Sequence, residues 1–519
     1  MNREEMLERI GDKSAKWDFI VIGGGATGIG IAVEAASRGY RVALLEQSDF
    51  SAGTSSRSTK LIHGGVRYLQ QGNVSLVLEA LKERGILRRN APHLVHDLPF
   101  IVPVYDWWEG PFYGVGLKIY DMLAGKAGFG PSQLLSKKDT LEKIPTVETR
   151  GLRGGVIYHD GQFDDSRLVI NLAQTAAEQG GTLVNYMKVV GLLKKNDIVY
   201  GVIARDMEDE REYEIKARAV INATGVFSDQ IRQMDDPSCD PFMRPSQGVH
   251  IVLDKSFLPG KTAIMVPHTD DGRVLFAIPW HDSVLVGTTD TPVTDISMAP
   301  LPMAEEIEFL LKHAGRYLTQ DPGPGDVLSV FAGLRPLVGA SHMETATISR
   351  EHAISISRTG LVTIAGGKWT TYRKMAEETL DHAIEIAHLG YRLPVTRHLR
   401  IHGYHNHADE FGDLKAYGSD ALEIQALVKK NRRLGETLPD TSILKAEVVW
   451  SVRHEMARTV EDFLGRRRRT LFLNARAALD AAPEVAKIMA RELGRGIFWK
   501  KQQLRAFQKT VEAFSIHRP

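Results

Sequence analysis

Glycines near the start of the chain have the spacing that a dinucleotide site requires. Gly23, Gly25 and Gly28 follow the apolar run 19–22 and open a segment whose apolar residues recur at helical spacing. In such a unit the first glycine permits a tight turn, the second lets a pyrophosphate approach, and the third lets helix pack on strand. Glu46 ends the next apolar run, where a carboxylate can bind ribose hydroxyls. The unit predicts an FAD or NAD site, because Glu46 would repel the 2′-phosphate of NADP.

Cations beside glycines or strand ends could hold a ligand with several negative charges. Arg67 follows a pair of glycines, Arg335 lies in a GLRP segment, Arg350 ends an expected strand, and Lys368 follows another pair of glycines. A phosphate monoester carries roughly two negative charges at neutral pH, and forked guanidinium groups match its oxygens. A single arginine is more often part of a surface ion pair. Together these residues favour a site for a small phosphorylated molecule.

Two later segments have the pattern of a buried strand that runs into a glycine turn, at residues 218–226 and 360–368. The candidates for contact with the same cofactor are Ala223, Thr224, Gly225, Gly366, Gly367, Lys368 and Thr370. A long helical pattern follows the second turn, so the positive end of that helix could stabilise negative charge on a reduced flavin ring. A purely structural strand-to-helix turn would have the same sequence, and this alternative stays open.

The remaining patterns predict the domains that position these residues. An α/β, Rossmann-like FAD-binding domain is expected from three segments: 14–85, 160–240 and 331–395. Segments 86–159 and 241–330 are expected to combine as an α+β substrate or cap domain, because the second of them carries alternating strand patterns. Residues 396–519 contain several amphipathic helical patterns and predict a C-terminal helical domain.

The composition is that of a globular protein in a reducing compartment. The 519 residues include 65 Lys+Arg and 64 Asp+Glu, with 43% hydrophobic and 25% charged residues. These values exclude a disordered or collagen-like chain and give no general attraction to nucleic acid. Cys239 is the single cysteine, which excludes an intramolecular disulfide and a cysteine-based metal site. No metal is expected, and no apolar run of about 18 residues suggests a membrane span or a signal peptide.

Basic charge gathers near the C-terminal end. From residue 401 onward there are 21 Lys+Arg against 15 Asp+Glu, and Arg466 to Arg469 form a run of four arginines. A solvated helix surface or an interdomain contact is the more ordinary interpretation. The alternative is contact with a phosphate-rich partner, which would be an anionic membrane surface or RNA.

The segment GTSSRSTKLIHGGVRYL at 53–69 resembles the signature of FAD-dependent glycerol-3-phosphate dehydrogenases. The likeness extends to the Gly23 unit, to DDSRL at 164–168, to GLRP at 333–336 and to GGKWTTYR at 366–373. This family belongs to the D-amino-acid-oxidase-like flavoproteins. The resemblance implies non-covalent FAD, oxidation of sn-glycerol 3-phosphate to dihydroxyacetone phosphate, and transfer of the electrons to quinone at a membrane.

The resemblance also implies roles for individual residues. Within the 53–69 motif, contacts to FAD would come from Thr54, Ser55, Ser58, Lys60, His63, Gly64 and Gly65. The substrate would be held by Arg67, Tyr68, Arg335, Arg350 and Lys368. Oxidation at C2 requires a hydride acceptor and a base for the hydroxyl proton. His250, on an expected cap strand, is the candidate base beside Arg335; alternatively, Arg335 polarises the hydroxyl and water or the flavin carries the proton.

The expected partners follow from the same resemblance. They are glycerol 3-phosphate, a quinone acceptor and an anionic membrane surface, with no nucleic acid, and a homodimer is a candidate assembly. The expected location is cytoplasmic, peripheral to the inner face of the cell membrane. The alternative function is a glycerol-3-phosphate oxidase, which would use O2 and release H2O2.

Overall fold

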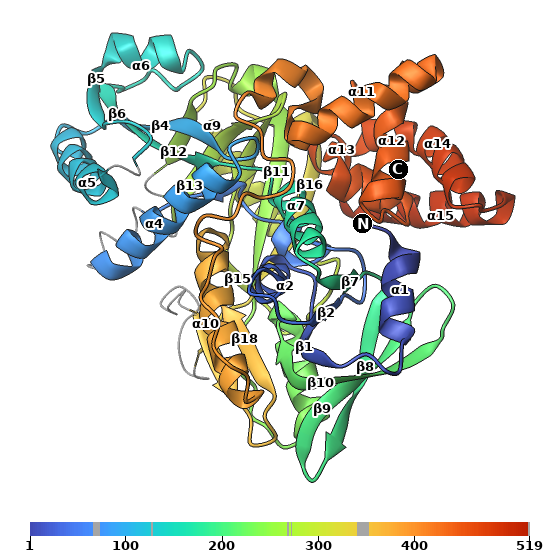
Figure 1. Ribbon diagram of the computed structural model, residues 1–519. Coiled ribbons are helices and arrows are strands. Elements are labelled where there is room, and N and C mark those ends of the chain that lie inside the picture. The colour runs from blue at the N-terminus through green and yellow to red at the C-terminus, as the bar shows by residue number, and fades with distance from the viewer. Residues whose placement is uncertain (66–72, 126–127, 267–268, 271, 340–351, 517–519) are drawn as a thin grey trace.

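The computed structural model describes residues 1–65, 73–125, 128–266, 269–270, 272–339 and 352–516 (Figure 1). Two sheets organise the chain, with helices against them and a helical C-terminal part. None of the helices in the described ranges combines the length and the apolar character that a bilayer-spanning helix requires.

The first sheet has a parallel centre. Its strand order is β17-β18-β10-β1-β2-β7, with β17 antiparallel at one edge. The bounds are β1 Trp17–Ile22, β2 Val42–Leu45, β7 Thr182–Val184, β10 Glu212–Asn222, β17 His352–Ile356 and β18 Val362–Gly366. The β1 side chains are almost all buried, as expected for a strand covered on both faces. A ribbon of β8 (Met187–Lys195) and β9 (Ile198–Asp206) continues from β10 by antiparallel pairing.

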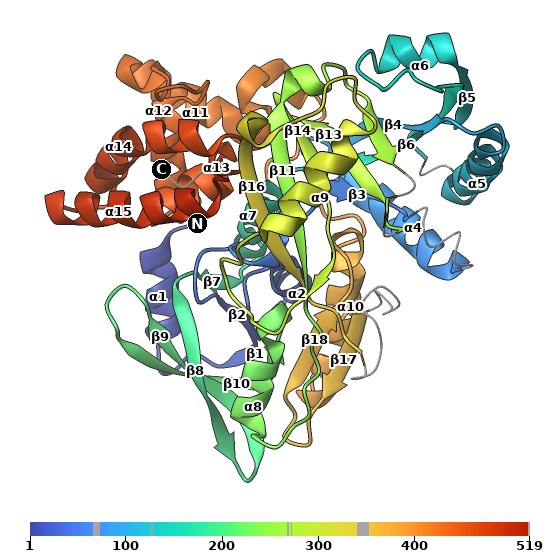
Figure 2. The same cartoon turned by 180° about the vertical axis from the view of Figure 1, so that it is seen from behind.

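Helix α2 (Ala26–Ser37) connects β1 to β2 and lies between α7 (Asp165–Glu178) and α10 (Tyr372–Ile386). A side chain at Gly30 would place a Cβ 2.9 Å from the Tyr372 ring, so glycine lets α2 and α10 approach closely. Helices α1 (Arg3–Gly11) and α8 (Ser228–Asp235) lie near the β8–β9 ribbon, as Figures 1 and 2 show.

The second sheet is mostly antiparallel and is best seen from behind (Figure 2). Its order is β15-β11-β14-β13-β12-β4-β6-β3, with β16 on β11 and β5 on β6. The strands are β3 Leu61–Ile62, β4 His96–Val104, β5 Gln133–Ser136, β6 Gly154–Gln162, β11 Ser246–Asp254, β12 Ala263–Val266, β13 Leu275–Trp280, β14 Ser283–Gly287, β15 Thr291–Pro292 and β16 Val327–Arg335. Its helices are α4 Val74–Asn90, α5 Glu109–Ala124, α6 Lys137–Lys143 and α9 Ala304–Gly315.

The strands of this sheet do not stop at the domain limits expected from the sequence. β6 continues past residue 159, β16 continues past residue 330, and β3 pairs with β6 although it lies within 14–85. Strand pairing joins segments that are distant in sequence, so a change of pattern along the chain locates such limits only to within a few residues.

The C-terminal part is helical, with α11 Ala421–Lys430, α12 Lys445–His454, α13 Thr470–Leu473, α14 Ala475–Glu492 and α15 Ile497–Ala513. Its core is not separate from that of the second sheet. Val252 and Phe331 of the sheet belong to one buried cluster with Phe472, Val485 and other apolar residues of the helices. The helical part therefore packs against the sheet that carries His250 and Arg335.

Candidate cofactor and substrate site

A cavity of about 210 Å³ opens beside the carboxyl ends of β1, β2, β10 and β18. This is the edge at which open parallel sheets bind ligands. The following predicted cofactor residues line it: Gly23, Gly25, Glu46, Thr54, Ser55, Ala223, Thr224, Gly225, Gly366, Gly367 and Lys368. Segments that are far apart in the sequence thus meet around one space.

The glycines of the first turn have the geometry that their spacing predicts. Gly23 has a φ of 111°, and a Cβ there would lie 2.6 Å from the carbonyl oxygen of Ala223. A Cβ at Gly28 would lie 1.9 Å from the carbonyl oxygen of Gly23. Both positions therefore require glycine, Gly23 for the turn and Gly28 for the packing of α2 on that turn.

Glu46 lies at the end of β2 with its carboxylate turned to the same turn. It accepts hydrogen bonds from the backbone N–H of Gly24 at 2.6 Å and of Ser48 at 2.8 Å. Burial raises the pKa of Glu46, and these two hydrogen bonds act in the opposite direction. The carboxylate is thus fixed at the cavity, where it can accept hydrogen bonds from ribose hydroxyls.

The donor set of the cavity fits FAD. Helix α2 begins at Ala26, after the N-cap residue Gly25, and has no acidic residue in its first turn, so its positive end is available to a pyrophosphate. Ser55 Oγ lies at this helix end and accepts from the N–H of Ala26 at 2.9 Å. Glu46 would hold the ribose, and Lys368 adds a cation near the turn after β18. When bound, FAD supplies the hydride-accepting ring.

Several cavity residues were not among the sequence candidates. Met187, Lys188 and Val189 at the start of β8 line one side, and Phe227 and Met298 complete other parts. No local motif marks them, because β8 reaches the cavity only through its place beside β2 and β9. The apolar side chains of Met187, Val189, Phe227 and Met298 suit a flat aromatic group such as adenine or the flavin.

Ser58 and Lys60, by contrast, do not line this cavity. The Nζ of Lys60 donates to Asp165 at 2.6 Å and to the carbonyl of Ser56 at 2.8 Å, and Ser58 Oγ donates to the same carboxylate at 2.7 Å. Burial lowers the pKa of Lys60 to about 7, although Asp165 opposes the shift. These bonds fix the 53–60 loop in its fold, and contact of Ser58 and Lys60 with the cofactor stays a prediction.

His63, Gly64 and Thr370 form a junction beside the cavity. Thr370 Oγ1 accepts from the backbone N–H of His63 and donates to its carbonyl, each at 3.2 Å. The N–H of Gly64 donates to the hydroxyl of Tyr120 at 2.8 Å. Gly65 follows with a φ of 79°. This junction ties the end of the 53–65 segment to the start of α10.

His250 and Arg335 lie on one face of the second sheet. Ser246 of β11 pairs with Arg335 of β16, and His250 pairs with Phe331. Glycines at the intervening positions leave room for the two side chains. A Cβ at Gly248 would lie 2.4 Å from a guanidinium nitrogen of Arg335.

The His250 ring is buried and ordered by its neighbours. It stacks on Phe331 with ring centroids 5.0 Å apart, and its Nε2 lies 3.0 Å from the Thr59 hydroxyl oxygen. Its Nδ1 is also buried, with no hydrogen-bond partner in the described part of the chain. Burial lowers the pKa of His250 well below 6.5, and the charges of Lys60 and Arg335 act in the same direction. The ring is therefore neutral at physiological pH, which is the state that a base requires.

The guanidinium of Arg335 is held in one orientation. It donates to Asp290 at 2.9 Å, to the carbonyl of Thr289 at 2.7 Å and to the hydroxyl of Thr288 at 3.1 Å. Only about a fifth of its side chain is exposed. The next residue, Pro336, lines the cavity, so Arg335 is held close to it. The other predicted substrate residues, Arg67, Tyr68 and Arg350, lie outside the described residues.

The run of arginines is not a surface patch. Arg466, Arg467 and Arg469 are at most 6% exposed. Arg466 and Arg467 both bind the carboxylate of Asp49, at 2.8 and 2.5 Å, and Arg469 donates to the carbonyl of Ser56. The interdomain interpretation is confirmed, and contact of this run with a membrane or RNA was wrong. Charge along the sequence could not show that carboxylates elsewhere in the chain bury these guanidiniums.

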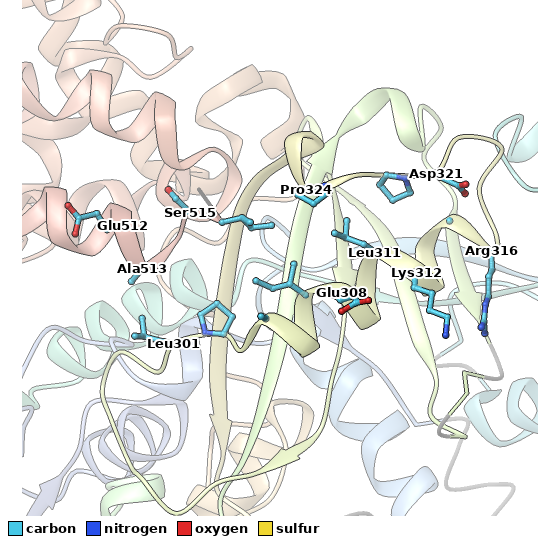
Figure 3. Close-up of a pocket in the computed structure, with 16 residues that line it drawn as sticks. Leu301, Glu308, Leu311, Lys312, Arg316, Asp321, Pro324, Glu512, Ala513 and Ser515 are labelled. Atoms are coloured by element: carbon cyan, nitrogen blue, oxygen red, sulfur yellow. The ribbon is translucent and has the colours of Figure 1, made fainter. Parts of the chain in front are cut away.

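Another, larger cavity, of about 1030 Å³, lies between α9 and the end of α15 (Figure 3). Its cations, Lys312 and Arg316, already pair with Asp270. Leu301, Ile307 and other apolar side chains form most of the remaining lining. Its lining also includes Glu308, Asp321 and Glu512, but it has no glycine-rich turn between a strand and a helix, so the cavity at the sheet edge is the candidate site.

Comparisons with known proteins agree with this site. A model of FAD dependent oxidoreductases matches residues 18–373, and a model of the C-terminal domain of alpha-glycerophosphate oxidase matches residues 357–504. The mitochondrial glycerol-3-phosphate dehydrogenase of Mus musculus is 41% identical over 543 residues, which cover 97% of this chain and 74% of that protein.

Solved structures show the same relationship. The glycerol-3-phosphate dehydrogenase from Bacillus halodurans complexed with FAD is 29% identical, with a TM-score of 0.81 and coverage of 99% of this chain and 97% of that chain. The L-alpha-glycerophosphate oxidase from Mycoplasma pneumoniae, 18% identical with a TM-score of 0.58 over 74% of this chain and 98% of that chain, shares the fold. The expected FAD-binding α/β fold with a C-terminal helical domain is confirmed. The chain belongs to the FAD-dependent glycerol-3-phosphate dehydrogenase family, and FAD is its cofactor.

Proposed function

We propose that this chain oxidises sn-glycerol 3-phosphate to dihydroxyacetone phosphate and passes the electrons to a membrane quinone. The observation that carries the proposal is the similarity to glycerol-3-phosphate dehydrogenases along nearly the whole chain. The fixed guanidinium of Arg335 and the ammonium of Lys368, both close to the cavity, support a phosphorylated substrate.

In this proposal the protein positions the substrate and accepts its hydroxyl proton. Arg335 and Lys368 would bind the anionic substrate and orient C2 toward the cofactor cavity. His250 would take the proton of the C2 hydroxyl, while the C2 hydrogen leaves as hydride to the bound cofactor, so that the carbonyl forms. The neutral ring of His250, fixed by Phe331 and Thr59, supports this role. The nearby cations favour the developing negative charge on the oxygen.

The electron acceptor distinguishes a quinone-linked dehydrogenase from an oxidase. Anaerobic addition of glycerol 3-phosphate to the purified protein should bleach the oxidised flavin spectrum. Turnover should then be supported by a quinone analogue, with little H2O2 formed in air. Efficient H2O2 formation without quinone reduction would instead identify an oxidase, and a flavin spectrum that does not change would refute the substrate.

We propose a peripheral membrane location for the same reason, because a quinone dissolves in the bilayer. We also propose a homodimer as a candidate assembly. Sedimentation with vesicles and light scattering of the purified protein test these two points separately.

A further inference from the structure

The ring of His250 is enclosed on the sheet face where it lies. His250 of β11 pairs with Phe331 of β16 on one side and with Gly287 of β14 on the other, and Figure 2 shows these strands side by side. The ring stacks on Phe331, and a Cβ at Gly287 would lie 2.2 Å from the Cδ2 atom of His250. Only 3% of His250 is exposed. Packing on both sides therefore fixes the ring in one position.

The two ring nitrogens of His250 differ in what they can reach. Nδ1 is buried, and within the described ranges it has no hydrogen-bond partner. Nε2 lies 3.0 Å from the hydroxyl oxygen of Thr59. Thr59 is half-buried, whereas His250 is buried. The Thr59 hydroxyl is therefore the polar group through which a proton can reach the ring.

Thr59 is held in place by the residues on both sides of it. Ser58 donates to the carboxylate of Asp165 from its backbone N–H at 3.0 Å and from its hydroxyl at 2.7 Å. The Nζ of Lys60 donates to the same carboxylate at 2.6 Å, and Asp165 is fully buried. Because both neighbours bind one buried group, the hydroxyl of Thr59 is preorganised toward the histidine ring.

The segment that carries Thr59 runs from the cofactor cavity along β16. At its start Thr54 lines the cavity and donates to the carbonyl of Leu334 at 2.7 Å. Further along, Arg57 donates to the carbonyl of Ala332 at 2.9 Å. Thr59 follows, and its hydroxyl reaches the next strand, β11. The segment thus connects the cavity with the buried histidine.

Arg335 lies on the same face of the sheet as His250. A Cβ at Gly248 would lie 2.4 Å from a guanidinium nitrogen of Arg335, so the guanidinium lies over Gly248. Gly248 and His250 are two positions apart on β11 and face the same side. A small phosphorylated alcohol bound by Arg335 would therefore lie on the face that carries the His250 ring.

We propose that Thr59 relays the C2 hydroxyl proton of the substrate to His250, so that His250 acts through Thr59 and not by direct contact. The C2 hydroxyl gives its proton to Oγ1 of Thr59 while Thr59 gives its own hydroxyl proton to Nε2 of His250. The electron pair of the broken O–H bond forms the C2 carbonyl, and the C2 hydrogen leaves as hydride to the bound cofactor. Thr59 ends the step neutral and His250 ends it protonated. The relay rests on the proposed function.

The relay requires one particular tautomer of the His250 ring. Nε2 must be bare to accept from Thr59, so the neutral ring carries its proton on Nδ1. The opposite tautomer would donate from Nε2 to Thr59 and would leave only the buried Nδ1 as a base. The position of this proton is therefore a direct test of the relay.

The kinetic test uses three variants of the FAD-loaded enzyme. Thr59→Val keeps the approximate size of the side chain but removes the hydroxyl, whereas Thr59→Ser keeps the hydroxyl. Ser329→Ala is the matched control, because Ser329 of β16 is buried and its hydroxyl donates to the carbonyl of Leu471 at 2.9 Å. The control thus removes a buried hydroxyl from the same sheet and leaves the contact between Thr59 and His250 intact.

The measured quantity is the rate at which glycerol 3-phosphate bleaches the flavin without air. We expect Thr59→Val to lower the limiting rate about 10²–10⁴-fold, with little change in the substrate concentration that gives half of it. Thr59→Ser should stay close to the wild type, and Ser329→Ala should match the wild type. FAD content should be equal in all of them.

The tautomer is measured by nitrogen-15 NMR of the enzyme with labelled histidine, and His250→Gln identifies the His250 signals by their loss. We expect the proton on Nδ1. Should the wild type fail to oxidise glycerol 3-phosphate with any acceptor, the proposed function fails. An active wild type with the proton on Nε2 would instead refute the relay alone.

Two kinetic results would also overturn the relay. One is a Thr59→Val variant that bleaches as fast as the wild type. The other is a Thr59→Ser variant as slow as Thr59→Val, which would assign Thr59 to packing. If Thr59→Val melts early, Thr59→Ala replaces it, with the same expected loss of rate and the same criterion.

Discussion

The buried carboxylate of Asp49 offers a sharp test of how the C-terminal helices are attached. Asp49 is fully buried and binds Arg466 at 2.8 Å and Arg467 at 2.5 and 2.9 Å. Asp49→Asn keeps the shape of the side chain but removes the charge, and it leaves two guanidiniums facing an amide.

The loss of stability expected for Asp49→Asn follows from this geometry. Breaking a buried ion pair by removing one partner lowers the free energy of unfolding by about 3–5 kcal/mol. Asp282→Asn is the matched control, because Asp282 is 94% exposed and pairs with Lys255 at 3.0 Å. An exposed pair contributes roughly 0–1 kcal/mol, so this control should melt like the wild type.

The assay is thermal unfolding followed by circular dichroism and by release of flavin fluorescence. Asp49 lies three residues after Glu46, so the Asp49→Asn variant should also release FAD at a lower temperature. Equal melting of the two variants would refute the conclusion that this cluster secures the C-terminal helices to the cofactor domain.

The stabilisation that the Asp49 carboxylate contributes should change with pH in one direction. Burial alone would raise the pKa of Asp49, but Arg467 and Arg466 more than offset it and hold the pKa below the ordinary value of 3.8. The stabilisation is therefore complete above that value and is lost as the pH falls through the lower folded pKa. The difference between wild type and Asp49→Asn should be constant near pH 7 and narrow only below about pH 4.

Three further predictions concern the site. Gly28→Ala should yield protein with little visible flavin absorbance, because the new Cβ would lie 1.9 Å from the Gly23 carbonyl oxygen; normal flavin content would contradict the assigned turn. His250→Gln should lower turnover about 10²–10⁴-fold with FAD retained. Since the pKa of His250 is well below 6.5, the wild-type acid limb of kcat/KM should lie below that pH, and a limb above it would exclude His250 as the base. Arg335→Ala should lower kcat/KM for glycerol 3-phosphate about 10- to 100-fold while flavin stays bound, whereas colourless protein would assign Arg335 to cofactor support.

Much of the cofactor site could be predicted because its signals are local. The turn at Gly23 and the acid at Glu46 lie within one strand–helix–strand unit, where glycine spacing and apolar periodicity are set by neighbours in sequence. The turns after β10 and β18 were found in the same way. Met187 and Val189 were missed because β8 reaches the cavity only through the pairing of strands.

The surroundings of the run Arg466 to Arg469, by contrast, could not be predicted from the sequence. Four consecutive arginines describe charge but not its surroundings, and the partner Asp49 lies more than 400 residues away in the sequence. Burial and ion pairing are long-range properties, so the sequence could not distinguish a surface patch from an interdomain bond.

By itself the sequence determined the nucleotide-binding turns, since these depend on residue types at short spacings, and its motifs carried the resemblance that implied FAD and the family. The tertiary structure alone decided that His250 and Arg335 lie on one sheet face, that Ser58 and Lys60 bind the buried Asp165, and that Arg466, Arg467 and Arg469 are buried. The physical reason is that strand register and burial are set by contacts between segments far apart in the chain, and no local pattern encodes them.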